Sequence, residues 1–391
     1  MKIVFLANYP IMNFKQYVSL KYDINVSAYW NYNLVSTLAK KNDVEIHVVS
    51  AFHGLKKDAN FKHENVNHHF VKISKIKNLL TGYMYTHRKL LKITHSIKPD
   101  IVAGIGTEHI YAYTAVKSGF KHVVTIHGIM RNVIKKEKNF FTRHKYFYLL
   151  EKYVLNKSKN IISINPFVNE NLGKLIKGNI YNVENCIPKS FFDYSPKIKK
   201  TSNKLKLVFV GTIEPRKGVL DLLLACSMLK DSNVNFTLDI VGSNPSNQVE
   251  YLNKINQIIK KKLNDFDIKF HGHLQQSKIA ELVYNSSVLI LPSYEETAPM
   301  VISEAMALGT PVISTKVAGI PWMIDDNVTG LLFNPGNYEE LFNKILFIFS
   351  DNKNSIRISK EARMKSEELY HPEMVADKTY NVYKQIISNL K

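Results

Sequence analysis

Hydrophobic residues in this chain gather in short β-branched runs that alternate with longer stretches of helical periodicity. Continuous apolar runs of this length are typical of parallel strands that are buried on both faces. The runs of the first half are 2–8, 44–50, 100–106, 122–128 and 160–165, and those of the second half are 205–212, 237–243, 268–273, 287–293, 311–317 and 330–333. Each half therefore predicts a doubly wound α/β domain, in which helices cover a parallel sheet.

Residues 188–204, PKSFFDYSPKIKKTSNK, interrupt this alternation, because they contain two prolines and several lysines but no apolar period. At 391 residues the chain also exceeds the usual size of one hydrophobic core. We therefore predict an N-terminal domain over 1–187, a linker over 188–204, a C-terminal domain over 205–370 and an amphipathic helix within 371–391. Parallel sheets bind ligands at the carboxyl ends of their strands, so two facing sheets predict a site in an interdomain cleft.

The positive charge of the chain lies in its first half. The formal net charge is +20, yet residues 1–200 carry 32 basic and 12 acidic residues, whereas residues 201–391 carry 21 of each. Tyrosine and phenylalanine are scattered among the lysines of the basic half. Such a surface suits nucleic acid, an anionic membrane or a phosphorylated acceptor.

Two basic segments, 72–98 and 131–153, mix lysines with aromatic and aliphatic residues, as interfacial helices do. Peripheral membrane binding is one hypothesis for them, and helices with ordinary solvated lysine faces are the other. No apolar stretch approaches the roughly 18 residues of a membrane span, and the apolar run after Lys2 is too short for a signal peptide. Cys186 and Cys226 form no CxxC motif, which indicates packed thiols in a reducing compartment. We expect a cytoplasmic protein, with attachment to the inner face of the cell membrane as the second hypothesis.

Common nucleotide and metal motifs are incomplete in this sequence. GIGTEH (104–109) has His109 at the place of the third glycine of GxGxxG, and GTIEPRKG lacks the GK[ST] ending of a P-loop. HENVNHH (63–69) offers three imidazoles in a polar stretch without the HExxH spacing. We predict a solvated loop there rather than a metal site.

The stretch VGTIEPRKGV (210–219) joins a predicted strand to a predicted helix. Gly211 allows close approach at the strand end, and Pro215 stiffens the turn. Arg216 and Lys217 then lie where the first amides of the helix point outward. Two cations together with a helix dipole favour a diphosphate site over a solvated basic turn.

Two carboxylates flank the next strand-to-helix turn, in SYEETAPMVISEAMALGTPVIST (293–315). A helix that begins near Pro299 and ends at Gly309 places Glu296 just before it and Glu304 inside it. Eight helical residues rise about 12 Å and turn about 80° past two full turns, so the two acids lie on roughly the same side. Carboxylates accept hydrogen bonds from paired sugar hydroxyls, and this interval suits two hydroxyl-bearing rings joined by a diphosphate.

These residues carry a resemblance to a known family. The Glu296 to Glu304 spacing, the following AMALGTPVIST, the segments VAGIPWMI (317–324) and VTGLLF (328–333), and the upstream VGTIEPRKG together resemble the family 4, or group 1, retaining glycosyltransferases. The resemblance is strong over 205–335 and looser elsewhere. It implies the GT-B fold, with two facing Rossmann-like domains, an acceptor bound mainly by the first, a nucleotide sugar bound mainly by the second, and a last helix that returns to the first.

The resemblance also implies an activity and a set of roles. Members of the family transfer a sugar, here expected to be a hexose, from a nucleotide-sugar donor with retention of configuration and without a metal or other cofactor. Their acceptors include glycans and polyprenyl-phosphate-linked sugars of bacterial surface polysaccharide synthesis, and no nucleic-acid partner is implied. By position, His127 and Glu296 would be catalytic, and the donor-binding residues would be Gly211, Arg216, Lys217, Glu296, Thr297, Ala298, Pro299, Met300 and Glu304.

The chain departs from the family pattern in two places. Thr212 stands where many members have an arginine directly after the glycine, so we assign the second phosphate charge to Arg216. The first domain has DINVSAYW (23–30) where members usually have a Gly-Gly pair, so no acceptor-side residue is predicted from it.

The predicted mechanism is leaving-group stabilisation, in which the cations and helix amides take up the negative charge that grows on the departing nucleoside diphosphate. A sugar-nucleotide epimerase of GT-B fold is the alternative enzyme. A nucleic-acid-binding protein would account for the charge of the first half but not for the paired glutamates in the neutral half.

Overall fold

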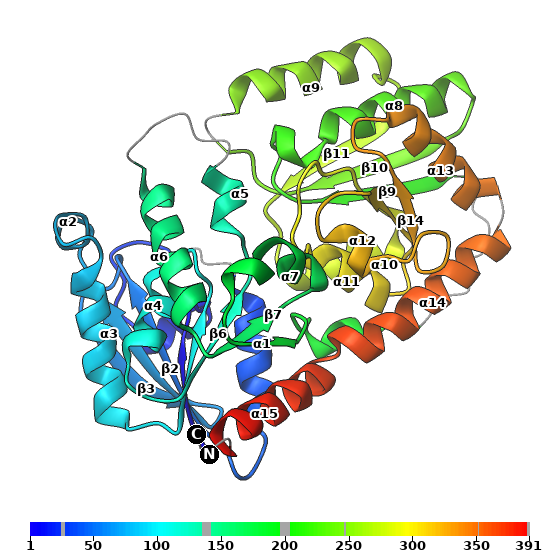
Figure 1. Cartoon of the computed structure of the whole chain (residues 1–391). Helices are drawn as coiled ribbons and strands as arrows, with labels where there is room; N and C mark the ends of the chain where they lie inside the picture. Colours follow the sequence, from blue (N-terminus) through cyan, green and yellow to red (C-terminus); the bar gives the residue numbers. More distant parts are fainter. Residues whose placement is uncertain (25–27, 135–141, 196–203, 246–247, 351, 389–391) are drawn as a thin grey trace. The chain divides into compact units, whose positions relative to one another are not determined.

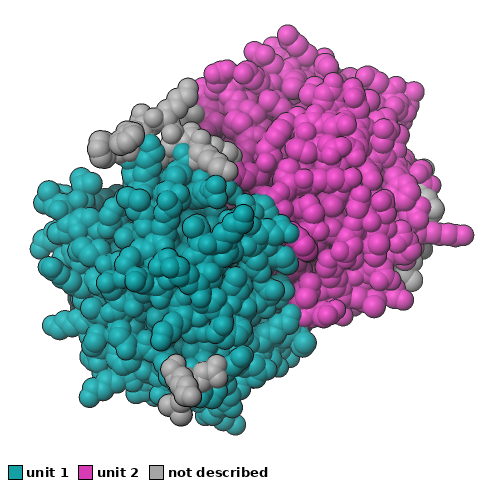
Figure 2. Space-filling view, in the orientation of Figure 1, with its two compact units in different colours: residues 1–186, 372–391 teal, residues 187–371 magenta. Residues whose placement is uncertain are grey.

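The computed structural model describes residues 1–24, 28–134, 142–195, 204–245, 248–350 and 352–388. The chain forms two compact units, one made of residues 1–186 and 372–391 and the other of residues 187–371. Figure 1 labels the elements, and Figure 2 shows the two units in different colours.

Unit 1 is built on an eight-stranded sheet with the order β3-β4-β2-β1-β5-β6-β7-β8, in which β3 alone runs antiparallel to its neighbour. Its strands are β1 (Lys2–Leu6), β2 (Glu45–Phe52), β3 (Ala59–His63), β4 (Val66–Lys72), β5 (Ile101–Ile105), β6 (His122–Ile126), β7 (Asn160–Ser163) and β8 (Asn179–Asn182). Its helices are η1 (Ile11–Tyr17), α1 (Tyr29–Leu38), α2 (Lys75–Leu80), α3 (Met84–Ile97), α4 (Ile110–Lys117), α5 (Met130–Ile134), α6 (Arg143–Lys157), α7 (Pro166–Leu172), η2 (Gly173–Leu175) and α15 (Pro372–Ser388).

Alternate residues of the central strands of unit 1 feed two apolar layers. Ile3 and Phe5 of β1 pack in the layer that contains residues of α1 and α15, whereas Val4 and Leu6 pack in the layer that contains residues of α3 and α4. Both faces of β1 are therefore buried, which explains the continuous apolar run in its sequence.

Unit 2 is built on a six-stranded, all-parallel sheet with the order β11-β10-β9-β12-β13-β14. Its strands are β9 (Leu205–Val210), β10 (Phe236–Val241), β11 (Asp267–Gly272), β12 (Val288–Leu291), β13 (Val312–Thr315) and β14 (Leu331–Phe333). Its helices are η3 (Lys189–Phe191), η4 (Pro215–Lys217), α8 (Val219–Asp231), α9 (Val249–Lys262), α10 (Gln276–Asn285), α11 (Met300–Ala307), α12 (Ile320–Met323), α13 (Tyr338–Ser350) and α14 (Asn352–Tyr370).

Every strand predicted from an apolar run overlaps a strand of the structure, and the prediction of two doubly wound α/β domains is confirmed. The predicted C-terminal helix is α15, which belongs to unit 1 and packs against α1 (Figure 1). Both cysteines are free and buried, as predicted. Among the described residues, no helix is long and apolar enough to cross a membrane.

The segment predicted as a linker, 188–204, is described only in part, because residues 196–203 lie outside the described ranges. Residues 188–195 pack as part of unit 2, where Phe191 is buried. The Arg363 guanidinium on α14 donates to the carbonyl oxygens of Phe192 and Tyr194, both at 2.7 Å. This part of the segment is therefore fixed by the body of unit 2.

The prediction of a solvated loop at HENVNHH was wrong. Residues 59–72 form the β3–β4 hairpin, and its turn residues Glu64 and Asn65 have the positive φ angles of 46° and 63°. His68 is buried and stacks on Phe61, with its ring centroid 4.7 Å from that of Phe14. The imidazole thus serves as a flat core side chain, which a polar–apolar pattern does not reveal.

Candidate active site

The turn between β12 and α11 carries the paired glutamates. Its residues run from Pro292 to Pro299, and Pro299 is the N-cap of α11. The Pro299 side chain makes no hydrogen bond, so it does not occupy the first amides of the helix. Glu296 is buried in this turn, and its carboxylate accepts a hydrogen bond from Ser293 Oγ at 3.0 Å. The Glu296 carbonyl oxygen accepts from the Gly319 amide at 2.9 Å, which ties the turn to the start of α12. Thr297 and Ala298 complete the turn ahead of the helix, and Met300 is the first residue of α11.

The turn between β9 and α8 lies directly against the β12–α11 turn. Gly211 follows β9, and its amide donates to the Val241 carbonyl at 2.9 Å. Gly218 has a φ of +69°, and a Cβ at this position would lie 2.0 Å from the Pro292 carbonyl oxygen. The Tyr294 amide donates to the Arg216 carbonyl at 2.8 Å. Only glycine fits at position 218, because the two turns approach each other backbone to backbone.

Arg216 and Lys217, the two predicted phosphate-binding cations, are both paired with carboxylates. Lys217 Nζ binds the Glu296 carboxylate, and Arg216 Nη1 lies 3.7 Å from the same oxygen. Arg216 Nη2 also donates to Glu214 Oε1 at 2.8 Å, and that oxygen accepts from Thr212 Oγ1 at 2.8 Å. The structure thus brings three predicted site residues together, and it shows a role for Glu214 that the sequence did not indicate.

Glu304 lies inside α11 and takes a different partner. Its carboxylate accepts a hydrogen bond from Gln276 Nε2 at 3.2 Å. Burial raises the pKa of the Glu304 carboxyl to about 7, and the bond from Gln276 opposes this shift only in part. A carboxyl with this pKa is well placed to gain a hydrogen-bond donor when a ligand binds.

His127 belongs to unit 1, where it directly follows β6. Both of its ring nitrogens are buried and have no hydrogen-bond partner among the described residues. Burial lowers the pKa of His127 to about 4, so the ring is neutral at physiological pH. It borders a small cavity of about 20 Å³, together with Trp30, whose ring centroid lies 5.4 Å away. The volume is enough for about one water molecule.

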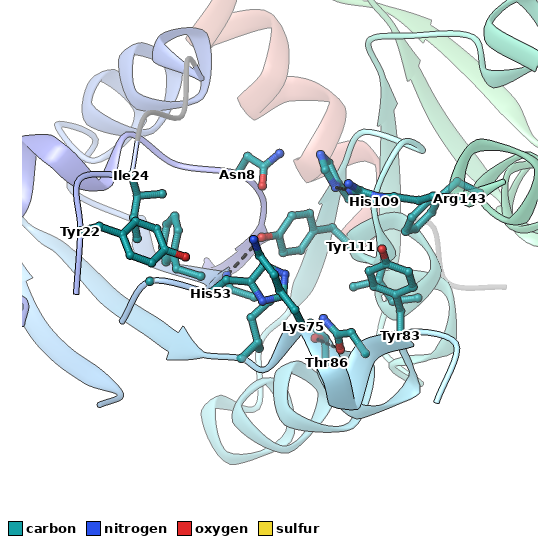
Figure 3. Close-up of a pocket in the computed structure, with 17 residues that line it drawn as sticks. Asn8, Tyr22, Ile24, His53, Lys75, Tyr83, Thr86, His109, Tyr111 and Arg143 are labelled. Carbon is teal, nitrogen blue, oxygen red and sulfur yellow. Dashed lines mark hydrogen bonds between the residues drawn. The ribbon is translucent and has the colours of Figure 1, made fainter. Parts of the chain in front are cut away.

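A larger cavity of about 290 Å³ in unit 1 was not predicted from the sequence (Figure 3). It lies at the carboxyl ends of β1, β2 and β4 and is lined by residues that end or follow these strands and by residues of α2, α3, α4 and α6. Of the 23–30 segment, for which no acceptor-side residue was predicted, Ile24 lines the cavity, and residues 25–27 lie outside the described part of the chain. The general rule for parallel sheets was the one signal that could have located it.

Comparisons with known proteins match both halves of the chain. Residues 190–365 match the family model described as "Glycosyl transferases group 1", and residues 28–189 match the model described as "Glycosyltransferase Family 4". An uncharacterized glycosyltransferase of Methanocaldococcus jannaschii is 25% identical over 342 residues, which are 82% of this chain and 84% of that protein. A glycosyltransferase of Escherichia coli, named as putatively acting in colanic acid biosynthesis, is 26% identical over 46% of each chain.

Solved structures share the fold over almost the whole chain. The sucrose-phosphate synthase of Thermosynechococcus elongatus superposes with a TM-score of 0.80 at 17% identity and covers 100% of both chains. The HepE protein of Anabaena, solved in complex with UDP, superposes with a TM-score of 0.74 at 16% identity and covers 98% of this chain and 100% of that one. The fold is therefore the two-domain GT-B fold that the sequence predicted.

Proposed function

Because the chain belongs to the group 1, or family 4, glycosyltransferases, we propose that it transfers a hexose from a nucleotide-sugar donor to a glycan or lipid-linked acceptor, with retention of anomeric configuration. The observation that carries this proposal is the pair of interlocked turns in unit 2, where Lys217 and Arg216 meet the buried carboxylate of Glu296. The HepE structures, which were solved in complex with UDP and with UDP-glucose, support a nucleotide-sugar donor. The E. coli relative supports a role in bacterial surface polysaccharide synthesis.

The donor site proposed here works by exchange of partners. The diphosphate of the donor takes over Lys217 and Arg216, which frees the Glu296 carboxylate to accept hydrogen bonds from the hydroxyls of the donor sugar. Gly211 and the backbone from Thr297 to Met300 border the bound diphosphate and sugar. Glu304 accepts hydrogen bonds from the ribose hydroxyls, which offset the cost of its buried charge.

The chemical step proposed here rests on stabilisation of the leaving group. Negative charge grows on the departing diphosphate, where the two cations and the first amides of α11 are fixed in advance, so no metal is required. The catalytic role of His127 suits a neutral imidazole whose two nitrogens have no partner in the described part of the chain and can hydrogen-bond the reacting sugars. Turnover that survives exhaustive dialysis against EDTA, with unchanged rate, is the expected result for transfer without a metal.

A membrane-bound acceptor is part of the proposal because of the surface of α2. Ile76, Leu79 and Leu80 are 72%, 82% and 79% exposed, and Lys75 and Lys77 lie on the same short helix. Apolar tips flanked by lysines suit the interface of an anionic membrane. We therefore propose peripheral attachment of a cytoplasmic protein through α2.

Nucleotide binding tests the proposal first. We expect one of UDP, GDP, ADP and CMP at saturating concentration to raise the melting temperature by about 5 °C and the shift to weaken in Glu304→Gln. Release of the diphosphate should then require an acceptor, and the anomeric configuration of the product should match that of the donor. No shift with any nucleotide would contradict the donor site. Turnover of the nucleotide sugar into an isomer without an acceptor would instead favour the epimerase.

A further inference from the structure

The 290 Å³ cavity of unit 1 has no role in the donor site described above, yet it has the features of a binding pocket (Figure 3). Figure 3 shows Lys75, His53, Tyr111, His109 and Tyr83 arranged around it. These residues come from well-separated parts of the chain, and the pocket lies at the strand ends where parallel sheets bind ligands. Its chemistry can therefore be derived from its lining.

The pocket carries positive charge that no carboxylate balances. Lys75 and Arg143 line it, and no aspartate or glutamate is among its lining residues in the described parts of the chain. Arg143 contacts only neutral groups there, namely His109 Nδ1 at 3.3 Å and the aromatic rings of Tyr83 and Phe147. Lys75 has no ion pair within the described ranges.

The two histidines of the pocket add donors and acceptors rather than charge. Burial, and to a smaller extent the charge of Arg143, lowers the pKa of His109 to about 4. Burial and then the charge of Lys75 lower the pKa of His53 as well. The positive charge of the pocket therefore comes from Lys75 and Arg143.

The floor of the pocket presents buried hydrogen-bond donors that lack acceptors. Asn78 is 2% exposed, and its Oδ1 accepts from Thr86 Oγ1 at 2.6 Å, whereas its Nδ2 has no partner among the described residues. The Tyr111 hydroxyl oxygen accepts from the Ala51 amide at 3.1 Å, which leaves its proton free to be donated. Burial raises the pKa of Tyr111 to about 12, so this proton stays in place. Buried donors without acceptors are unfavourable unless a ligand supplies the acceptor.

The walls of the pocket are suited to the body of a sugar. Tyr22 and Tyr83 present aromatic rings, and Ile24, Ile73 and Phe147 add apolar surface. Flat apolar faces of this kind pack against the C–H face of a sugar ring, while the polar floor fixes its orientation.

We propose that this pocket binds a phosphate group of the acceptor, held by Arg143 and Lys75 at its rim and by Asn78 and Tyr111 at its floor. Two cations and two neutral donors match a dianion with several terminal oxygens better than the single negative charge of a carboxylate. This inference rests on the proposed transferase function and specifies its acceptor. The phosphate can belong to a soluble sugar phosphate or to a lipid-linked sugar.

Binding of inorganic phosphate to the full chain tests the pocket without turnover. We expect isothermal titration at low ionic strength to show binding that is about tenfold or more weaker in Arg143→Gln and several-fold weaker in Lys75→Gln. Both side chains are exposed, so the variants should melt like the wild type. Lys77→Gln is the matched control, because Lys77 lies on the same helix but does not line the pocket.

A second set of variants separates this pocket from the donor site. Lys217→Ala should leave phosphate binding at the pocket in place, whereas Arg143→Gln should leave the UDP-type thermal shift unchanged. Phosphate binding that is lost in Lys217→Ala and retained in Arg143→Gln would overturn the inference while leaving the transferase intact. Binding of glucuronate in preference to phosphate would overturn it too.

The source of the phosphate is settled by comparing acceptors. Glucose 6-phosphate in solution and a polyprenyl-diphosphate sugar in detergent micelles are the two probes, each with the wild type and Arg143→Gln. The probe whose binding depends on Arg143 identifies the acceptor class as soluble or lipid-linked. If Arg143→Gln leaves the binding of both probes unchanged, the inference is contradicted.

Discussion

The interlocked turns of unit 2 and the pocket of unit 1 each present two cations, but they treat the charge in opposite ways. Arg216 and Lys217 are held by Glu214 and Glu296, so a ligand must displace a carboxylate before it can use them. The cations of the unit 1 pocket face no carboxylate among the described residues, so an anion binds there without displacing one. In unit 2, where carboxylates pair with the cations, the site favours ligands that supply both a diphosphate for the cations and sugar hydroxyls for the carboxylate. In unit 1, where the cations have no carboxylate partner among the described residues, the pocket attracts anions of many kinds, and added salt weakens this attraction more strongly.

Removal of the lysine in unit 2 is the strongest test of this comparison. We expect Lys217→Ala to lower turnover by about 10²- to 10³-fold, because it removes a fixed cation from the charge that grows on the leaving group. The variant also leaves the buried Glu296 carboxylate without its main partner, at a cost of about 1–3 kcal/mol in the free energy of unfolding. Steady-state kinetics and chemical denaturation measure the two effects.

A double variant separates the two roles of Lys217. We expect Lys217→Ala with Glu296→Gln to recover stability, since the unpaired charge is gone, but not turnover, since both the phosphate cation and the proposed catalytic carboxylate are missing. Near-normal turnover in a folded Lys217→Ala protein would show that the diphosphate lies elsewhere. In unit 1, Arg143→Gln should change no stability, since no carboxylate of the described residues pairs with that cation.

The contact between the two turns of unit 2 gives the next largest effect. We expect Gly218→Ala to lower the free energy of unfolding by about 3 kcal/mol or more, because its Cβ would meet the Pro292 carbonyl oxygen at 2.0 Å and its φ is +69°. Gly309→Ala is the matched control, with a φ of +65° and no atom within 4 Å of the added Cβ. Gly309→Ala should lower the free energy of unfolding by only about 1 kcal/mol. Equal losses in the two variants would mean that the turns are free to separate.

How far the sequence predicts this molecule depends on the kind of signal. Buried parallel strands have continuous apolar runs, so β1 and β9 were evident. The edge strand β8, with the sequence NIYN, and the β3–β4 hairpin with its buried His68 were missed, because neither has such a run. An edge strand such as β8 is partly exposed to solvent, so its sequence is not continuously apolar. His68 is buried, but a histidine counts as polar in a hydrophobic pattern.

The site shows the same limit at a finer scale. Motif spacing placed Glu296 just before the helix and Glu304 inside it, because residues eight positions apart are related by local structure. It did not predict the pairing of Glu296 with Lys217, which are 79 positions apart and meet only through sheet topology. The unit 1 pocket was missed for the same reason, since its lining comes from separate strand ends and helices.

The stability of the protein should depend on pH through Glu304, a buried carboxyl of unit 2 with no counterpart among the described residues that line the unit 1 pocket. Its pKa is raised from 4.5 to about 7, so between these values the folded protein binds more protons than the unfolded chain and stability falls as the pH rises. Between pH 4.5 and 8 we expect the free energy of unfolding of the wild type to fall by up to about 3 kcal/mol relative to that of Glu304→Gln, which has no carboxyl at this position. Denaturation of both proteins across this range measures it.

Nucleotide binding should reverse the proton balance at the same residue. Ribose hydroxyls that donate to the carboxylate favour its ionised form, so binding below pH 7 releases a proton and strengthens as the pH rises. Titration in buffers of different ionisation enthalpy counts the proton, and Glu304→Gln is expected to release none. Proton release that persists in this variant would assign the titration to another group.

The smallest expected effect concerns the outer surface of unit 1. If α2 inserts into an anionic membrane, Leu79→Ser and Leu80→Ser should each weaken co-sedimentation with phosphatidylglycerol vesicles by about three- to tenfold, since each removes apolar surface that leaves water on binding. Met364→Ser in unit 2 is the control, because Met364 is also exposed but lies on α14.

Salt separates the two contributions to this membrane contact. Added salt should weaken the binding of the wild type and of both leucine variants by a similar factor, because the lysines supply the electrostatic part and the leucines the apolar part. If the leucine variants instead bind like the wild type at every salt concentration, the positive charge of unit 1 attracts the vesicles without insertion of α2. The lysines of unit 1 would then act as a general anion-binding surface.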